Sequence, residues 1–262
     1  MKPLQNLNTI TNKKTIQNRY ASWQPVTHQN DSYNGFVASR KNYLFLKRLL
    51  DILFSVPIVL LLLSWLLPIL ALLIKSDSKG PVIFKQKRIG LNGRSFVCLK
   101  LRTMIVNSEA DEIPARENDD RITRLGNFLR RTHLDELPQF LNVLAGQMSL
   151  VGPRPHMTAD CIRFSFVISS YSFRHFAKPG ITGWAQVKGY HGPTKDYESI
   201  MNRYYWDAQY IRKLCLWLDV KIIALTITGS IYKLYIESSP FYGKKNSNHK
   251  NNSLAVFPPD SF

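Results

Sequence analysis

The stretch that decides the fold runs Arg130-Arg131-Thr132-His133-Leu134-Asp135-Glu136-Leu137-Pro138-Gln139. Because Pro138 has no backbone N–H to donate, it is tolerated near a helix start. The adjacent carboxylates Asp135 and Glu136 are therefore expected at or just before a helix N-terminus, with Gly146 as a candidate stop for that helix. Neighbouring helical side chains point about 100° apart, so one carboxylate can attack a substrate while the other holds a cation.

The expected position of this acid pair favours its ionised form. A helix N-terminus stabilises negative charge, and the nearby Arg130 and Arg131 act in the same direction. Asp135 would then be available as a nucleophile toward phosphorus. The alternative is an acidic first turn that only caps a helix.

Three further motifs surround the acid pair. One precedes it and two follow it: Lys100-Leu101-Arg102-Thr103-Met104, Gly146-Gln147-Met148-Ser149-Leu150-Val151-Gly152-Pro153-Arg154-Pro155 and Lys178-Pro179-Gly180-Ile181-Thr182-Gly183-Trp184-Ala185-Gln186-Val187. Together and in this order they resemble the bacterial sugar transferases, the monotopic phosphoglycosyl transferases. The resemblance runs from about Tyr43 to about Ile231, and several long motifs in one order make it specific.

The resemblance implies a phosphoglycosyl transferase that moves a sugar 1-phosphate from a UDP-sugar to polyprenyl (undecaprenyl) phosphate and releases UMP. It implies that Asp135 attacks the β-phosphorus and holds the sugar phosphate covalently, while Glu136 binds Mg²⁺, an ion that prefers oxygen ligands. The implied phosphate-binding cations are Lys100, Arg102, Arg130, Arg131 and Arg154. The implied nucleotide-sugar region holds Pro179, Gly180, Thr182, Gly183, Trp184 and Gln186.

The composition agrees with anionic partners. The chain of 262 residues carries a formal net charge of +17, with a pI of about 9.9. Such a balance suits nucleic acid, an acidic membrane face or phosphorylated substrates. No signature of a nucleic-acid-binding module is visible, so nucleic acid is not an expected partner. The three cysteines form no CxxC or zinc pattern, which predicts reduced structural thiols: Cys98, Cys161 and Cys215.

A membrane segment is expected over residues 49–74, which are almost wholly apolar and long enough to cross a bilayer. Lys47 and Arg48 precede it and Lys75 and Lys79 follow it, and basic flanks stay in the cytoplasm. A helix that enters and returns satisfies both flanks, and Pro57 or Pro68 could supply its bend. The resemblance implies this re-entrant form, although the Ser-Pro pair where the family often breaks is separated here, as Ser64 and Pro68. A single span is the alternative.

A β-hairpin is expected from Val82–Arg88 and Ser95–Leu101, which partly alternate apolar with polar residues around Gly90-Leu91-Asn92-Gly93. It would deliver Lys100 and Arg102 to the acid pair. The alternative is that these cations, with Arg88, form only a solvated face.

Two later turns are expected. One is a rigid turn at Gly152-Pro153-Arg154-Pro155, and the other is a tight turn formed by Lys178-Pro179-Gly180 and Gly183-Trp184. The first turn fixes Arg154, whose forked guanidinium suits a diphosphate. The alternative is that Arg154 is a structural residue under a loop. In the second turn, Trp184 either stacks near a base or packs in the core. Residues 204–235 mix aromatic, apolar and charged side chains, which favours amphipathic helices on the membrane surface over ordinary core helices.

The sequence departs from the family pattern at Gln147, where an Asp is common, and at Lys188, where an Asn is frequent. His156, Arg174-His175 and 189–194 look like the hexose-1-phosphate branch, which uses UDP-glucose or UDP-galactose for capsule and exopolysaccharide. An N-acetylated donor stays open. The rivals are a glycosyltransferase that releases UDP, a non-catalytic scaffold of a polysaccharide assembly complex, and a basic nucleic-acid binder.

The expected fold is α+β, anchored by one re-entrant helix, with a small cytosolic catalytic domain that carries a β-hairpin and amphipathic surface helices. The expected order is a disordered tail, a membrane segment, the catalytic domain and a second disordered tail: 1–42, 43–79, 80–237 and 238–262. The acidic block 107–120 is expected to be a solvated segment or a flap near the site. The expected location is the cytoplasmic face of the bacterial inner membrane, at the first membrane step of exopolysaccharide, capsule or O-antigen synthesis, and a homodimer stays open.

Overall fold

The computed structural model describes residues 35–37, 39–106, 119–190 and 197–238. It is a mixed helical and sheet structure, as the sequence predicts, with one long apolar helix near its N-terminal end and two small sheets. The predicted flap at 107–120 lies, except for its last two residues, outside the described part, as do most of the two predicted tails. Lys41 and Asn42, predicted to be tail, instead begin the first long helix.

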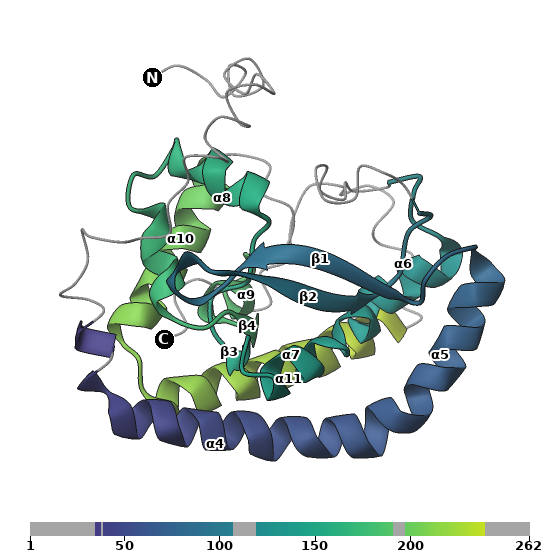
Figure 1. Ribbon diagram of the computed structural model, residues 1–262, viewed down its shortest axis with the longest axis horizontal. Helices are drawn as coiled ribbons and strands as arrows, with labels where there is room; N and C mark the ends of the chain where they lie inside the picture. Colours follow the sequence, from purple (N-terminus) through teal and green to yellow (C-terminus); the bar gives the residue numbers. More distant parts are fainter. Residues whose placement is uncertain (1–34, 38, 107–118, 191–196, 239–262) are drawn as a thin grey trace.

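A bent helix forms one edge of the molecule (Figure 1). It consists of α4 (Lys41–Pro57), a π-helical segment η2 (Ile58–Leu63) and α5 (Ser64–Asp77). The bend therefore lies between the two prolines proposed for it, directly after Pro57. A π-turn inserts an extra residue, and a proline removes a hydrogen bond, so both loosen the backbone ladder there.

Side chains supply bonds at this bend. Ser64 Oγ donates to Leu60 O at 2.6 Å, and Trp65 Nε1 donates to Leu61 O at 2.7 Å. Local side-chain donors of this kind satisfy carbonyls where a helix changes register inside an apolar environment.

The polar residues of α4 face the rest of the protein. Lys47, Asp51 and Ser55 recur every four residues on one side of the helix and are buried. Asp51 Oδ1 accepts from Ser149 Oγ and from Leu150 N, both at 2.9 Å. Asp51, the charged residue inside the apolar run, therefore links α4 to the segment 149–150.

The predicted hairpin is confirmed with a shift of one residue. Strands β1 (Ile83–Ile89) and β2 (Ser95–Leu101) pair antiparallel, with Gln86 opposite Cys98. The 3₁₀ turn η3 (Leu91–Gly93) joins them, and its positive φ angles at Asn92 and Gly93, 52° and 73°, suit these two residue types.

The remaining elements follow the hairpin in the chain. Their bounds are α6 (Arg124–Arg131), η4 (Leu134–Glu136), α7 (Gln139–Leu144), β3 (Ser149–Val151), α8 (Thr158–Ser165), η5 (Tyr171–Phe176), β4 (Gly180–Thr182), α9 (Trp184–Val187), α10 (Tyr197–Arg212) and α11 (Leu216–Ser238). Strands β3 and β4 pair in parallel.

Glycine is required where the two predicted turns meet. A Cβ on Gly152 would lie 2.2 Å from Lys178 O, and one on Gly183 would lie 2.2 Å from Gly152 O. Only residues without a side chain allow the two backbones to pack this closely. The turn at 152–155 thus lies directly against the segment 178–183.

The two C-terminal helices differ in burial. Helix α10 buries residues along its length, whereas α11, which runs beside α4 in Figure 1, exposes Trp217 at 76 % and Ile227 at 54 %. The expected apolar surface is therefore found on α11, and α10 is a core helix. Of the three cysteines, Cys98 and Cys161 are buried and Cys215 is exposed.

Candidate active site

The acid pair is placed by a turn between two short helices. Thr123 caps α6, with its Oγ1 accepting from Gly126 N at 2.9 Å. At the other end of α6, His133 takes a left-handed conformation with φ of 57°, which ends the helix and starts the single turn η4. Pro138 then caps α7. Asp135 and Glu136 therefore lie just before a helix N-terminus, as predicted.

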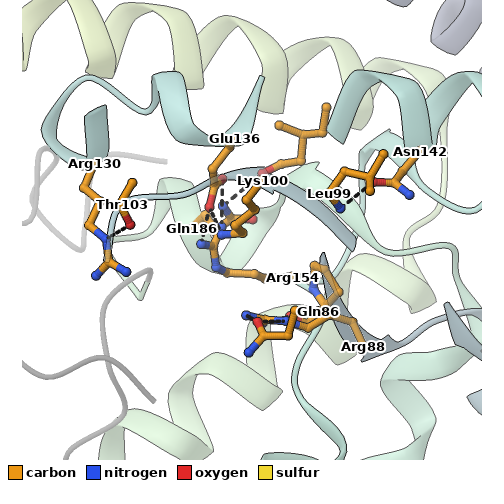
Figure 2. A network of polar contacts seen from close by, with 12 residues as sticks. Gln86, Arg88, Leu99, Lys100, Thr103, Arg130, Glu136, Asn142, Arg154 and Gln186 are labelled. Carbon is orange, nitrogen blue, oxygen red and sulfur yellow. Dashed lines mark hydrogen bonds and ion pairs between the residues drawn. The ribbon is translucent and has the colours of Figure 1, made fainter. Parts of the chain in front are cut away.

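Glu136 is held by two cations. Lys100 Nζ and Arg154 Nη2 each lie 2.6 Å from Glu136 Oε1, and Arg154 Nη1 lies 3.3 Å from Oε2 (Figure 2). Burial alone would raise the pKa of Glu136, but the charges and hydrogen bonds of Arg154 and Lys100 hold that pKa well below its usual range. The hairpin and the turn after β3 thus meet at one carboxylate.

Asp135 differs from its neighbour. It is 8 % exposed, and within the described part of the chain its carboxylate takes no hydrogen bond or ion pair. Burial raises the pKa of Asp135 above its usual value, against the opposing effect of Lys100 and with a further contribution from Glu136. Arg130 and Arg154 do lower this pKa, but desolvation outweighs them, so the expectation that the surroundings would favour the ionised form of Asp135 is wrong. The more basic carboxylate of the pair is therefore the unpaired one, which suits a nucleophile.

The other cations predicted to bind phosphate lie at different distances from the acid pair. Arg130 lies beside the pair, with its Nε donating to Thr103 Oγ1 at 2.8 Å, and burial lowers its pKa while Asp135 opposes that shift. Arg131 is exposed on the last turn of α6. The structure thus brings Lys100, Arg130 and Arg154 together around Glu136 and Asp135.

Arg102 does not point to this site. Its side chain is buried and donates to the carbonyl oxygens of Ile74, Ser78 and Lys79, with the first at 3.1 Å and the second at 2.5 Å. These carbonyls end α5, where unsatisfied acceptors attract a cation. Its predicted role toward substrate phosphate is corrected to that of a helix cap.

The predicted nucleotide-sugar region packs against the turn that carries Arg154. Gly180 and Gly183 pack against Gly152, as described above, and Thr182 Oγ1 lies 2.6 Å from Thr226 Oγ1 of α11. Trp184 packs against the core, and the centroids of the Trp184 and Trp206 rings lie 5.3 Å apart. Of the two roles expected for Trp184, the structure shows packing in the core. Pro179 O accepts from Ser149 N at 2.9 Å, and Gln186 Nε2 donates to Ile181 O at 3.1 Å.

Asn142 is a supporting residue that the sequence motifs do not single out. Asn142 of α7 accepts from Leu99 N at 2.9 Å and donates to Val97 O at 2.7 Å, so it fastens α7 to the hairpin edge. The Asn142 amide also donates to Gln147 Oε1 at 2.7 Å. Gln147, one of the two residues that depart from the family pattern, thus belongs to the contacts that support the site and not to the site itself. In the sequence, Asn142 can be noticed only as a polar residue within the largely apolar segment of α7.

Residues 42–233 match the bacterial sugar transferase family. The chain is 48 % identical over 184 residues to the UDP-glucose:undecaprenyl-phosphate glucose-1-phosphate transferase of Escherichia coli K12, covering 70 % of this chain and 39 % of that protein. It is 46 % identical over 182 residues to the protein of the same name from Caulobacter vibrioides, covering 69 % and 68 %.

It is also 42 % identical over 196 residues to the exopolysaccharide production protein PSS of Rhizobium leguminosarum, covering 72 % of this chain and 96 % of that protein. The chain spans about two fifths of the length of the first of these relatives. The matched range contains the acid pair, the three cations around it and all but the first residue of the bent helix. The chain therefore belongs to the bacterial sugar transferase family.

Proposed function

We propose that the protein transfers a hexose 1-phosphate from a UDP-hexose to undecaprenyl phosphate and releases UMP. The observation that carries the proposal is the division of labour in the acid pair: Glu136 is bound by Lys100 and Arg154, while Asp135 carries an unpaired, more basic carboxylate beside it. The names of the relatives support the same substrates, with UDP-glucose as the favoured donor.

In the first step, an Asp135 carboxylate oxygen attacks the β-phosphorus of the donor. The bond between that phosphorus and the bridging oxygen breaks, and UMP leaves with the bridging oxygen. The sugar phosphate remains on Asp135 as an acyl phosphate. In the second step, a phosphate oxygen of undecaprenyl phosphate attacks the same phosphorus and releases the Asp135 carboxylate.

The cations have separate tasks in this scheme. Lys100 and Arg154, already in contact with Glu136, are placed to neutralise the charge that develops on the transferring phosphoryl oxygens. Arg130 lies on the other side of the pair, where it would hold Asp135 and the incoming phosphate. The forked guanidinium of Arg154 suits two oxygens of one phosphate.

We further propose Mg²⁺ as the cofactor. Within the described residues, three or more His, Cys, Asp or Glu side chains do not gather into one group. Mg²⁺ often binds through one or two carboxylates plus substrate phosphates, so an adjacent Asp and Glu fit it. Glu136 Oε2, whose contact with Arg154 Nη1 is long at 3.3 Å, would hold the ion, which supplies charge neutralisation on the pyrophosphate.

The proposed location is the cytoplasmic face of the inner membrane. By length and composition the bent helix Lys41–Asp77 is apolar enough to cross a bilayer, and 17 % of its apolar window is buried within the protein. Its outward residues, with those of α11, would lie among the lipid chains: Leu44, Phe45, Leu49, Leu53, Leu60, Leu61, Leu72, Trp217 and Ile227. The bend at η2 supports a helix that enters and returns, with its basic ends on one side.

The released nucleotide tests the reaction. Purified protein is incubated with a panel of UDP-sugars, Mg²⁺ and undecaprenyl phosphate. UMP is the expected product, and the lipid should gain a hexose phosphate. UDP would instead support a direct glycosyltransferase, and absence of both products would support a scaffold. A parallel sample with EDTA should lose turnover and regain it when Mg²⁺ is added.

Topology has its own test. In a Cys215→Ser background, single cysteines replace Ser39 or Ser78, which flank the bent helix. Both should be shielded from an impermeant thiol reagent in intact cells and react after lysis. Labelling of only one flank in intact cells would establish a single span.

A further inference from the structure

The turn that carries Arg154 cannot support itself with its own backbone. Pro153 and Pro155 have no N–H groups, so the turn depends on donors from elsewhere for its carbonyl groups. Four consecutive carbonyls each accept from a different partner. Gly180 N donates to Pro153 O at 3.1 Å, Arg174 Nη2 to Arg154 O at 2.7 Å, Arg88 Nη1 to Pro155 O at 2.6 Å and Ile89 N to His156 O at 3.0 Å.

Arg174 is the deeper of the two arginine donors. Its side chain and that of Asp207 in α10 are each 2 % exposed, and both Nε and Nη2 of Arg174 bond to Asp207 Oδ2, at 3.1 and 2.7 Å. The ion pair holds the guanidinium in one orientation, with Nη2 shared between Asp207 and Arg154 O. Such a buried pair is poor evidence of stability but fixes geometry well.

Arg88 is oriented in a similar way from the hairpin. Its Nε donates to Gln86 Oε1 at 2.9 Å, and its Nη2 bonds to the same oxygen. The third nitrogen, Nη1, is thereby directed at Pro155 O. Figure 2 shows Gln86 and Arg88 below Arg154. Gln86 and Arg88 lie two residues apart on one face of β1, and Lys100 is paired with Phe84 on the same face.

We propose that Arg174 and Arg88 are positioning residues, which fix the backbone on either side of the Arg154–Pro155 peptide so that the Arg154 guanidinium reaches Glu136 and the substrate phosphate. Holding two consecutive carbonyls restrains the direction of the Arg154 Cα–Cβ bond. A long side chain magnifies any error in that direction, and displacement of a catalytic group by about 1 Å can cost about 10²-fold in rate. Neither residue contacts the acid pair directly.

The inference rests on the proposed function, because it assigns Arg154 a task in that reaction. It is tested with Arg174→Lys and Arg88→Lys, which keep the charge but lose the fork. UMP release is followed under single-turnover conditions over hours, so that slow rates are quantifiable. Each variant should lower the rate by about 10- to 100-fold with a change of less than about threefold in donor KM. Arg163→Lys is the matched control, because Arg163 pairs on the surface with Asp160 and should keep the wild-type rate.

The decisive measurement is made in an Arg154→Ala background. If Arg174 and Arg88 act through Arg154, adding either lysine substitution there should change the rate by less than about twofold. Additive losses in that background would overturn the proposal, as would wild-type rates in both single variants. Either variant alone decides the matter if the other does not fold.

Hydrogen exchange provides a readout without turnover. The amide of Gly180, which donates to Pro153 O, should exchange faster in Arg174→Lys, while the amide of Thr132 in the α6 cap should be unchanged. Failure of the wild type to release UMP would refute the proposed function, and unchanged exchange at Gly180 would refute the positioning role separately.

Discussion

Asp135 and Glu136 are adjacent in sequence but differ in what surrounds them. Asp135→Asn keeps size and shape and removes the charge of the proposed nucleophile, so turnover should fall by at least about 10³-fold and no covalent adduct should form. The wild type, given donor without acceptor, should gain the mass of one hexose phosphate and release at most one UMP per protein. Intact-protein mass spectrometry makes the measurement.

Glu136→Gln is the companion variant. It leaves Lys100 and Arg154 without a shared carboxylate, and it should also be inactive. A phosphosugar adduct that maps to Glu136, or near wild-type turnover in Asp135→Asn, would reverse the roles of the two residues.

Arg102 and Lys100 are two residues apart in the sequence, but Lys100 contacts Glu136 and Arg102 contacts the end of α5. Arg102→Gln removes bonds to the carbonyls that end α5, so it should destabilise the protein by about 1–3 kcal/mol and leave donor KM unchanged. Lys100→Gln should do the opposite, with lost activity and nearly unchanged thermal stability. A raised donor KM in Arg102→Gln at unchanged stability would return Arg102 to the site.

His175 gives a pH dependence of stability. Burial, with the neighbouring Arg174 charge, lowers the pKa of His175 from 6.5 to about 3. In the unfolded chain the imidazole takes up a proton near pH 6.5, whereas the folded protein excludes it until about pH 3. Between these values the unfolded state binds more protons, so stability falls on acidification, by about 2 kcal/mol at pH 5. Thermal unfolding of wild type and His175→Gln at pH 7 and 5 tests this: the variant should lose less stability between the two.

At the scale of elements, the π-segment η2 sets how α5 faces the protein. Leu70 and Ile74 of α5 pack with Leu101 and Leu129. The π-helical segment already holds one extra residue, so an alanine inserted after Leu61 would rotate α5 by about 100° relative to α4, which takes these residues off their partners. The insertion should lower the apparent Tm and the activity. Leu61→Ala, at a side chain 74 % exposed, is the control and should change neither in detergent. Equal behaviour of the two variants would mean that the register is not fixed by η2.

At the scale of the whole molecule, one ion pair joins the bent helix to the C-terminal helix. Lys47 Nζ lies 3.0 Å from Asp219 Oδ2, with side-chain exposures of 11 % and 3 %, and Tyr210 and Tyr43 bond to the same carboxylate. Asp219→Asn leaves a buried ammonium without its charge partner, which should cost about 3–5 kcal/mol. Asp77→Asn, at an exposed carboxylate ending α5, should cost almost nothing. Equal unfolding temperatures for these two variants would show that the pair does not hold α4 in place.

The sequence by itself determined the local features. Apolar length identified the bent helix, alternation and turn residues identified the hairpin, and Pro138 with Gly146 bounded the helix after the acid pair. These follow from short-range physics: backbone conformational preference, hydrogen bonding and side-chain period. The motifs around Asp135 and Glu136 identified the family in the same way.

Only the tertiary structure decided which charges meet. Lys100 and Arg102 are near neighbours in β2 and the residues after it, yet one faces Glu136 and the other caps α5. The partners of Glu136 come from positions 36 and 18 residues away, and Arg174 meets Asp207 across 33 residues. A charged side chain costs much to bury without a partner, but its sequence neighbours do not say which distant group will supply one. Long-range packing brings Lys100 and Arg154 to Glu136, and within the described residues it leaves the neighbouring Asp135 carboxylate without such a bond.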